Sequence, residues 1–290
     1  MAVNTDAMVL PDFGRCRAFW AREEVDRPSL ATWVGSFEMA GLYSHGLAQL
    51  PEGELTPSDI LPEAFRQDYE TLFEKHRQAS ADVPWSAFPL MLLPWLEAIA
   101  GCRIVHNSGN IWAEPCLDSY GQLNGGSGLQ PRLDWLAPPF AGGYGWSVQN
   151  LWAEEPGGWF QDDAIAYWSP SLYRTHAFPR ELKLSESIAR TGCHLHSTAI
   201  FTVDELLKMP ELGVIEINLD VVGKSISEMI PVFRRILEAQ RLYVWGHFSM
   251  DDLVVMKEKL PTRGLALQLM EETPEGVVAM VQVVEKIWLG

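Results

Sequence analysis

The chain has 290 residues, of which 47% are hydrophobic, and a formal net charge of −16 at pH 7. This length and apolar content suit one large α/β domain or two smaller ones. The acidic balance excludes nucleic acids and anionic membrane surfaces as expected partners, because both select basic patches.

Hydropathy and cysteine usage predict a cytoplasmic protein that does not enter the membrane. No apolar run approaches the roughly 20 residues that cross a bilayer. Residues 1–6 lack the basic stretch followed by an apolar one that is typical of an export signal. The cysteines have no CxxC spacing, which suits a reducing compartment and provides no thiolate zinc cluster. They are Cys16, Cys102, Cys116 and Cys193.

The first part of the chain mixes helical and strand patterns. Apolar residues recur at helical spacing in some segments, and other segments are apolar and β-rich, as buried parallel strands are. The predicted elements are a helix over 12–24, strands over 30–37 and 85–93, helices over 61–76 and 94–102, and a hairpin of 103–106 with 110–114. In the helix over 61–76, the expected inner face comprises Leu61, Phe65, Tyr69, Leu72 and Phe73.

The second part is more regular and predicts a parallel sheet. Five strand-like segments are each followed by a helix-like one, and such units imply helical crossovers. The pairs are 147–152 with 169–189, the strand ending at His196 with 202–209, 213–219 with a helix to 239, 242–247 with 251–259, and 264–269 with 274–288.

The fold prediction is a single α/β domain over residues 1–290, a TIM (β/α)8-type barrel with an N-terminal helical extension. The strand count falls short of eight, so an incomplete barrel is part of this prediction. Residues 121–146 are rich in Gly and Pro. This stretch is either a functional loop or the scar of missing elements.

Cys193-His194-Leu195-His196 is the motif around which the candidate site is organised. Side chains two apart in a strand share one face, so His194 and His196 point the same way. At the C-terminal end of a barrel strand, two imidazoles can bind a metal, move a proton or hold an anion. The alternative is one satisfied core histidine and one histidine that lines a loop.

The next strand offers carboxylate and amide groups to the same site. Glu216, Asn218 and Asp220 share one face, and two histidines with one carboxylate form a known type of zinc site. The predicted metal ligands are therefore His194, His196 and Glu216, with Asn218 contacting the substrate. The alternative is that these polar residues alternate with isoleucine and leucine because one face is wet.

Other candidates lie at loops and strand ends. Asp163, His247 and Gln268 are predicted catalytic residues, and Trp152 and Trp159 are predicted to wall a pocket for a flat substrate. The alternatives are a helix-start carboxylate at Asp163, a helix-capping role at His247 for which Ser249 is better suited, and a satisfied buried glutamine at Gln268. For the tryptophans, the alternative is that they anchor surface loops.

Several stretches resemble the uroporphyrinogen decarboxylase-like superfamily, which includes cobalamin-dependent methyltransferases. They are Phe19 to Pro28 (FWAREEVDRP), Leu55 to Glu63 (LTPSDILPE), Pro94 to Cys102 (PWLEAIAGC), Asp163 to Tyr173, with its Ser169-Pro170, and Cys193 to Ser197. The resemblance implies a barrel whose mouth is the active site, and it adds Tyr173 to the substrate-contacting residues.

The resemblance also narrows the chemistry. The decarboxylase grips an octa-acid tetrapyrrole with an arginine-rich segment, but this chain lacks the Arg-x-x-Gly-Arg pattern and has only four N-terminal arginines. They are Arg15, Arg17, Arg22 and Arg27. The methyltransferases hold zinc with H-x-C and a distant cysteine. Here His196 replaces the first cysteine, and no cysteine follows Cys193.

The preferred prediction is a corrinoid-linked methyltransferase that acts on a small molecule, with zinc at His194 and His196 and the corrinoid carried by a partner protein. One alternative is a decarboxylase of a tetrapyrrole-related or small aromatic acid. Another is a non-catalytic, ligand-binding barrel. An unclosed barrel would leave strand edges, which favours a homo-oligomer.

Overall fold

The computed structural model describes residues 12–35, 42–56, 58–79, 81–83, 102–114, 142–146, 150–161, 163–187, 190–219 and 223–290. The chain divides into two compact units. Unit 1 comprises Met1–Gly35, His76–Trp85 and Pro139–Gly290, and unit 2 comprises Ser36–Lys75 and Ser86–Pro138. The sequence predicts one domain over the same residues, whereas the contacts within the chain form two groups.

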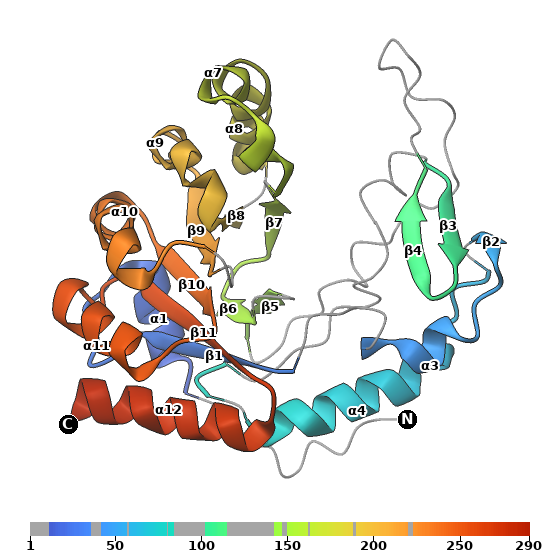
Figure 1. Cartoon of the computed structure of the whole chain (residues 1–290), viewed down its shortest axis with the longest axis horizontal. Helices are drawn as coiled ribbons and strands as arrows, with labels where there is room; N and C mark the ends of the chain where they lie inside the picture. Colours follow the sequence, from blue (N-terminus) through green and yellow to red (C-terminus); the bar gives the residue numbers. More distant parts are fainter. Residues whose placement is uncertain are drawn as a thin grey trace. The chain divides into compact units, whose positions relative to one another are not determined.

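A curled sheet of six parallel strands forms the centre of unit 1 (Figure 1). Its order is β1-β11-β10-β9-β8-β7, so the first strand pairs with the last. These strands are β1 (Ser29–Val34), β7 (Gly157–Gln161), β8 (Arg190–His196), β9 (Leu212–Asn218), β10 (Leu242–Gly246) and β11 (Leu265–Glu271). The predicted α/β class with a parallel sheet is confirmed.

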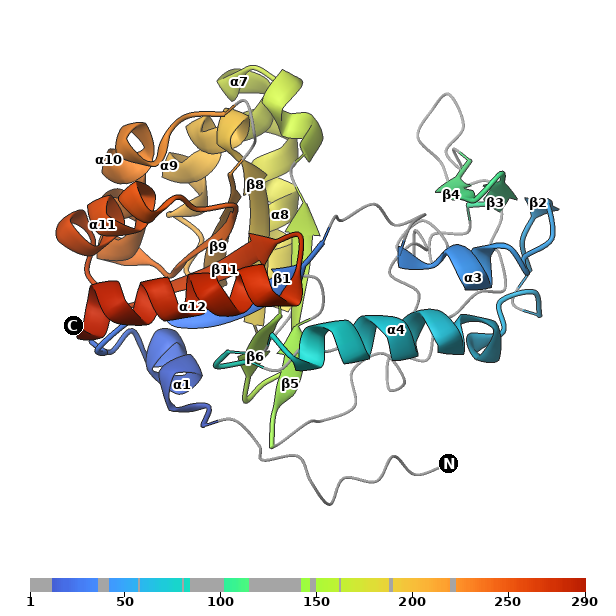
Figure 2. The same ribbon diagram turned by 60° about the horizontal axis from the view of Figure 1, so that its bottom comes forward.

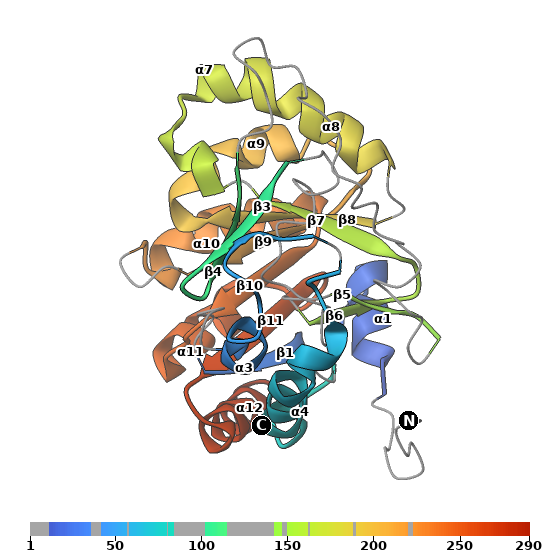
Figure 3. The same cartoon turned by 90° about the vertical axis from the view of Figure 1, so that its right-hand side faces the viewer.

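Helices cover one face of this sheet, which we call the outer face (Figure 3). Strand residues such as Leu195, Ile217, Val244 and Leu267 alternate toward these helices and form the main core with them. The helical elements are η2 (Asp163–Tyr167), α7 (Pro170–Leu172), η3 (Tyr173–Ala177), α8 (Phe178–Ser187), η4 (Ser197–Thr202), α9 (Val203–Leu206), α10 (Ile226–Ala239), α11 (Met250–Lys259) and α12 (Pro274–Leu289).

Local sequence signals explain where the last helices begin. Ser225 and Glu228 form a capping box at the start of α10, and Ser249 and Asp252 form another at α11. Thr273 caps α12 before Pro274. Figure 2 shows α12 lying along β11 and β1, which it contacts. Among the described helices, none combines the length and apolar composition needed to cross a membrane.

The opposite face of the sheet, which we call the inner face, is filled at the N-terminal ends of the strands. Helix α1 (Gly14–Ala21) packs Phe19 and Trp20 against Val214 and Tyr243 of the sheet. A short antiparallel pair, β5 (Tyr144–Trp146) with β6 (Leu151–Ala153), also contributes to this cluster. The inner face therefore has an apolar base, and its C-terminal half is lined differently.

One predicted strand is replaced by another. The sequence predicts a parallel strand at 147–152 before the helix at 169–189. In the structure this parallel strand is β7. The described part of 147–152 belongs to β6, which pairs with β5. Gly157 and Gly158 look like a loop in the sequence. Their strand forms because Gly192 of β8 leaves room for the Trp159 ring. The predictions at 85–93, 94–101 and 121–141 lie outside the described residues.

Unit 2 contains the predicted hairpin. Ser108 and Gly109 turn the chain with φ of 50° and 80°, which suits a tight hairpin turn. The elements of the unit are α3 (Ser44–Leu47), β2 (Gly53–Glu54), η1 (Pro62–Phe65), most of α4 (Arg66–Arg77), β3 (Ile104–Asn107) and β4 (Asn110–Ala113). The hairpin of β3 with β4 is confirmed, and β2 adds a third strand.

Two details of unit 2 differ from the predictions. Phe65 and Leu72 are buried as expected, but Leu61 and Phe73 of the expected inner face are exposed. Cys102 is disulfide-bonded, whereas the sequence suggested reduced thiols throughout. Cys16 and Cys193 of unit 1 are buried free cysteines.

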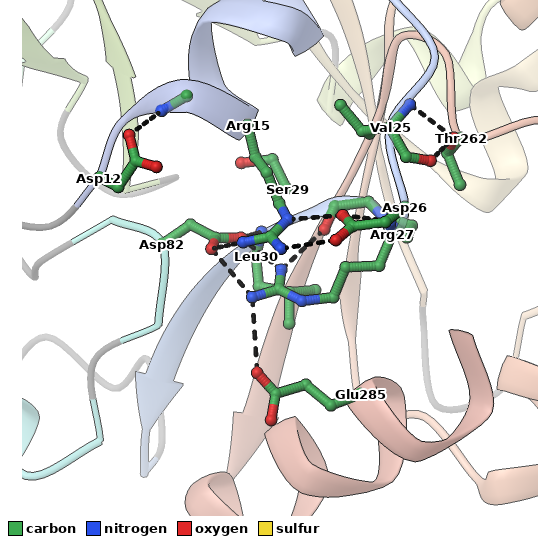
Figure 4. Close-up of polar contacts among 12 residues, drawn as sticks. Asp12, Arg15, Val25, Asp26, Arg27, Ser29, Leu30, Asp82, Thr262 and Glu285 are labelled. Atoms are coloured by element: carbon green, nitrogen blue, oxygen red, sulfur yellow. Dashed lines mark hydrogen bonds and ion pairs between the residues drawn. The ribbon is translucent and has the colours of Figure 1, made fainter. Parts of the chain in front are cut away.

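A buried ion pair joins distant parts of unit 1 next to β1 (Figure 4). Asp82 accepts two hydrogen bonds from the Arg27 guanidinium, at 2.5 and 2.9 Å, and a third from the Leu30 amide at 2.8 Å. Arg15 approaches the same carboxylate at 3.3 Å, and Glu285 of α12 lies 3.6 Å from Arg27. Through these contacts, the N-terminal segment is connected to Asp82 and to Glu285 of α12.

Candidate functional site

Polar side chains occupy the C-terminal half of the inner face. In β8, Cys193 and Leu195 face the outer core, so His194 and His196 project from the inner face. The parallel register places His194 beside Glu216, and His196 beside Asn218. The predicted shared face of these four residues is confirmed, because strand alternation alone is enough to produce it.

His194 and Glu216 form a buried dyad. The His194 Nδ1 atom lies 2.9 Å from Glu216 Oε1, and the two residues are 4% and 0% exposed. When Glu216 is ionised its carboxylate only accepts, so Nδ1 donates this hydrogen bond and Nε2 is the nitrogen through which the ring can pass a proton. Glu216 thus orients the imidazole and stabilises its cationic form.

Aromatic rings surround the dyad. The His194 ring contacts His196 at 5.0 Å between centroids with an interplanar angle of 88°, and it contacts Trp245 at 5.9 Å and 47°. Tyr243 is fully buried beside Glu216 in the register of β9 with β10. Burial, and next the charge of Glu216, raise the pKa of the Tyr243 hydroxyl well above its ordinary value. Tyr243 therefore keeps its proton near neutral pH and does not act there as a phenolate base.

The strand partners of Trp245 complete this surface. Its neighbours in register are Asn218 on one side and Gln268 on the other, and Met270 pairs with Trp33 of β1. Gln268 is fully buried in the middle of β11, because that strand continues to Glu271 rather than ending near residue 269. Gln268 lies on the inner face, but it is not at a strand end as predicted.

Sequence reasoning missed Trp33 and Trp245. Both are buried residues in β-rich stretches that were identified as strands. Counting every second residue from Tyr243, which faces the inner cluster, gives Trp245 directly. The signal was present in the strand period. Tryptophan carries no ionisable group, so a search for acid–base residues does not select it.

Two predicted substrate residues lie away from the dyad. Trp152 is 1% exposed, stacks on Phe13 with ring centroids 4.3 Å apart, and fills a core beside α1. Tyr173 is buried in the helical region that follows β7, where its hydroxyl donates to Glu181 at 2.6 Å. Trp159 packs against the apolar cluster at the base of the inner face and pairs in register with Gly192.

The remaining predicted catalytic residues are not brought to the dyad by any described contact. His247 is exposed and follows Gly246, whose φ of 148° and close approach to Leu219 require glycine. Ser249, rather than His247, caps α11, as the alternative interpretation held. Asp163 begins η2, and its side chain lies outside what the structure describes.

The donors of the predicted zinc site do not converge on one point. Across the described ranges, no group of three or more His, Cys, Asp or Glu side chains is arranged to hold a metal ion. Glu216 binds His194 directly, so it acts as the partner of that ring instead of a third ligand. The residues in this geometry do not fit a zinc ion held by His194, His196 and Glu216 together.

The four N-terminal arginines are engaged in bonds with the protein. Arg15 and Arg27 bind Asp26 and Asp82, and Arg17 binds Glu154. Arg22 donates to the carbonyl groups of residues 237–239 at the end of α10. These guanidiniums bind other groups of the protein near the N-terminal ends of the strands. They therefore do not form a cluster that could bind a polycarboxylate at the dyad.

Comparisons with protein-family models, curated proteins and solved structures give no match to this chain, so the site is interpreted from its own geometry.

Proposed function

We propose that this protein is a proton-transferring enzyme that decarboxylates a small aromatic or pyrrole-type acid at the C-terminal half of the inner face. The observation that carries the proposal is the buried His194–Glu216 dyad, with its 2.9 Å bond. A histidine whose Nδ1 is held by a buried carboxylate is suited to donate a proton from Nε2.

The reaction is written for the dyad as follows. A ring carbon that bears the carboxylate takes a proton from the His194 imidazolium. The bond to the carboxyl carbon then breaks, its electron pair returns to the ring, and CO2 leaves. His194 regains a proton from water, and Glu216 stabilises the cationic ring between turnovers.

The surroundings support this chemistry. Trp33, Trp245 and Met270 give the inner face apolar walls, which disfavour a carboxylate relative to neutral CO2. The engagement of the N-terminal arginines in bonds with the protein argues against an octa-acid tetrapyrrole and favours a substrate with few carboxylates.

We also propose that the curled sheet is part of a TIM-type barrel. In a closed (β/α)8 barrel the first and last strands pair, and β1 pairs with β11 here. The two edge strands of the sheet are β1 and β7, and residues 35–156 separate them in the chain. Ligands of such barrels bind at the C-terminal ends of the strands, where the dyad lies.

The test is CO2 release from a panel of small benzoic, hydroxybenzoic and pyrrole carboxylic acids in D2O. We expect the product to carry one deuterium at the carbon that lost its carboxyl group. His194→Gln should lower the rate by about 10²–10⁴-fold, which is the usual contribution of general acid catalysis. Glu216→Gln, which keeps the shape of the side chain, should give an intermediate loss and an altered pH–rate profile.

His247→Gln is the matched control, because His247 is an exposed histidine that follows the neighbouring strand β10. Its rate should equal that of the wild type. Circular dichroism of each variant separates loss of catalysis from loss of fold. A His194→Gln variant that folds and retains the wild-type rate would rule out the dyad as the acid.

Methyl transfer from a corrinoid-carrying partner is the second candidate, and the contact of His194 with His196 favours it. The two imidazoles are perpendicular with centroids 5.0 Å apart, and an ion bound by them would have to take its remaining ligands from groups other than Glu216. Elemental mass spectrometry of the wild type and of His194→Ala/His196→Ala tests this candidate. Stoichiometric zinc that is lost in the double variant would support methyl transfer. Metal-free wild-type protein would exclude methyl transfer as a candidate.

A further inference from the structure

A cavity lies in unit 1, at the opposite end of β8 from the dyad. It has a volume of about 230 Å³ and is lined by Arg17, Trp20, Trp152, Glu154, Glu155 and Arg190. Arg190 is the first residue of β8 and His194 of the dyad is the fifth, so the two sites are roughly 13 Å apart along the strand, at about 3.3 Å per residue. This cavity is separate from the site of the proposed decarboxylation.

Two guanidiniums lie at this cavity, each stacked on an indole. The Arg17 guanidinium lies 5.1 Å from the Trp152 ring centroid, and that of Arg190 lies 5.4 Å from the centroid of Trp20. The Trp20 indole donates to the Trp152 backbone carbonyl at 2.8 Å, which anchors the Trp20 ring to strand β6. The cation–π contacts thus hold both guanidiniums in place on a rigid base.

Each of these two guanidiniums donates a hydrogen bond to the protein through its Nε atom. Arg17 Nε donates to Glu154 at 2.8 Å, and Arg190 Nε donates to Glu155 at 3.1 Å. Within the described part of the chain, the Nη atoms of these two arginines have no hydrogen-bond acceptor. Guanidinium groups recognise carboxylates and phosphates through paired donors, so four such donors remain for a ligand.

The local charge is more positive than the lining alone suggests. Arg241 lies 5.6 Å from the Trp20 ring and bonds to the Trp20 carbonyl. Burial, followed by the positive charges of Arg190 and Arg22, lowers the pKa of Arg241 to about 10. Arg17, Arg190 and Arg241 outnumber the two carboxylates of Glu154 and Glu155 by one, so the balance here is positive in a chain of net charge −16, and it favours an anion.

We infer that this cavity binds a small dianion, of the phosphate or dicarboxylate type, between the Nη donors of Arg17 and Arg190. The ion pairs Arg17–Glu154 and Arg190–Glu155 are partly exposed, so they contribute little to stability. The two guanidiniums are instead suited to bind a ligand, because the indoles hold them at a cavity of suitable size. Glu154 and Glu155 hold the guanidiniums in position and compete with the ligand.

The experiment is isothermal titration of the full chain with inorganic phosphate and, separately, with succinate, at constant ionic strength. We expect at least one of the two to bind. Its affinity should fall at least tenfold in Arg17→Gln/Arg190→Gln. It should rise in Glu154→Gln/Glu155→Gln, because the competing carboxylates are removed. The comparison of phosphate with succinate identifies which anion chemistry the cavity prefers.

The matched control is Arg235→Gln, which removes an exposed arginine paired with Asp204 outside the cavity. Its affinity should equal that of the wild type, and circular dichroism verifies that each variant folds. The inference is overturned if neither anion binds, or if a folded Arg17→Gln/Arg190→Gln variant binds as tightly as the wild type. The decarboxylation assay is independent, since a failure there leaves these titrations unchanged.

Discussion

At the scale of single residues, burial decides what an ionisable group can do. Cys16 illustrates this most clearly in α1. Its thiol is 2% exposed and lies 3.5 Å from the Ser29 hydroxyl. Burial raises the pKa of the Cys16 thiol to about 12, and the Ser29 contact lowers it by less. In the folded protein this cysteine is a small apolar core residue and not a nucleophile.

The raised pKa of Cys16 predicts a loss of stability at alkaline pH. Above pH 9 the unfolded chain gains the thiolate, whereas the folded chain keeps the thiol until about pH 12. The free energy of unfolding should therefore fall by about 1.4 kcal/mol between pH 8 and pH 10 because of this group.

Urea unfolding of the wild type and of Cys16→Ala at pH 8 and pH 10 measures this difference. The variant lacks the thiol, so its stability should fall less over the same interval. Equal falls in the two proteins would show that the Cys16 thiol ionises normally in the folded state.

At the scale of elements, glycine positions determine which strands can pair. Gly192 of β8 lies under the Trp159 ring of β7, and a Cβ built there would lie 2.3 Å from that ring. A strand rich in glycine at 157–158 is therefore accepted by the sheet, because its neighbour leaves room for the tryptophan. Sequence patterns evaluated strand by strand do not reveal such a pair.

Gly192→Ala is expected to destabilise unit 1. Overpacking of this kind usually costs about 1–3 kcal/mol, because the ring must leave its rotamer or the strands must separate. Urea unfolding measures the change. Gly14→Ala in α1 is the control, since its Cβ would meet mainly the exposed Asp12 side chain and alanine favours a helix. Equal stability of the two variants would contradict the close packing of β7 on β8.

At the scale of the whole molecule, buried charges join segments that are far apart in the chain. The Asp82 carboxylate accepts hydrogen bonds from the Arg27 guanidinium and the Leu30 amide. Arg27 and Asp82 are each less than 8% exposed. Arg15 adds an exposed link from α1, and its pairing with Asp26 lowers the pKa of the Asp26 carboxyl. Asp82 is the buried counter-ion of the Arg27 guanidinium, whereas Glu285, 3.6 Å from it, is 45% exposed.

Asp82→Asn should lower the free energy of unfolding by about 3–5 kcal/mol, because Arg27 would be left buried without its counter-ion. Asp26→Asn is the matched control. Its carboxylate is more than half exposed and should contribute less than about 1 kcal/mol. Denaturant titrations of both variants test the difference, and a loss of similar size in both would show that burial does not set the strength of this network.

The sequence by itself determined the α/β class, the order of strands and helices from residue 190 onward, the hairpin at 104–113 and the shared face of His194, His196, Glu216 and Asn218. Each of these follows from a local period or a cap, and such signals lie within a few neighbouring residues.

Only the tertiary structure decided which partners those side chains meet. It paired Glu216 with His194, placed Trp152 in a core beside α1, and made β7 a strand of the sheet. It also separated two units and gathered arginines around Trp20. These outcomes depend on contacts between residues that are distant in sequence, and no local period encodes such contacts.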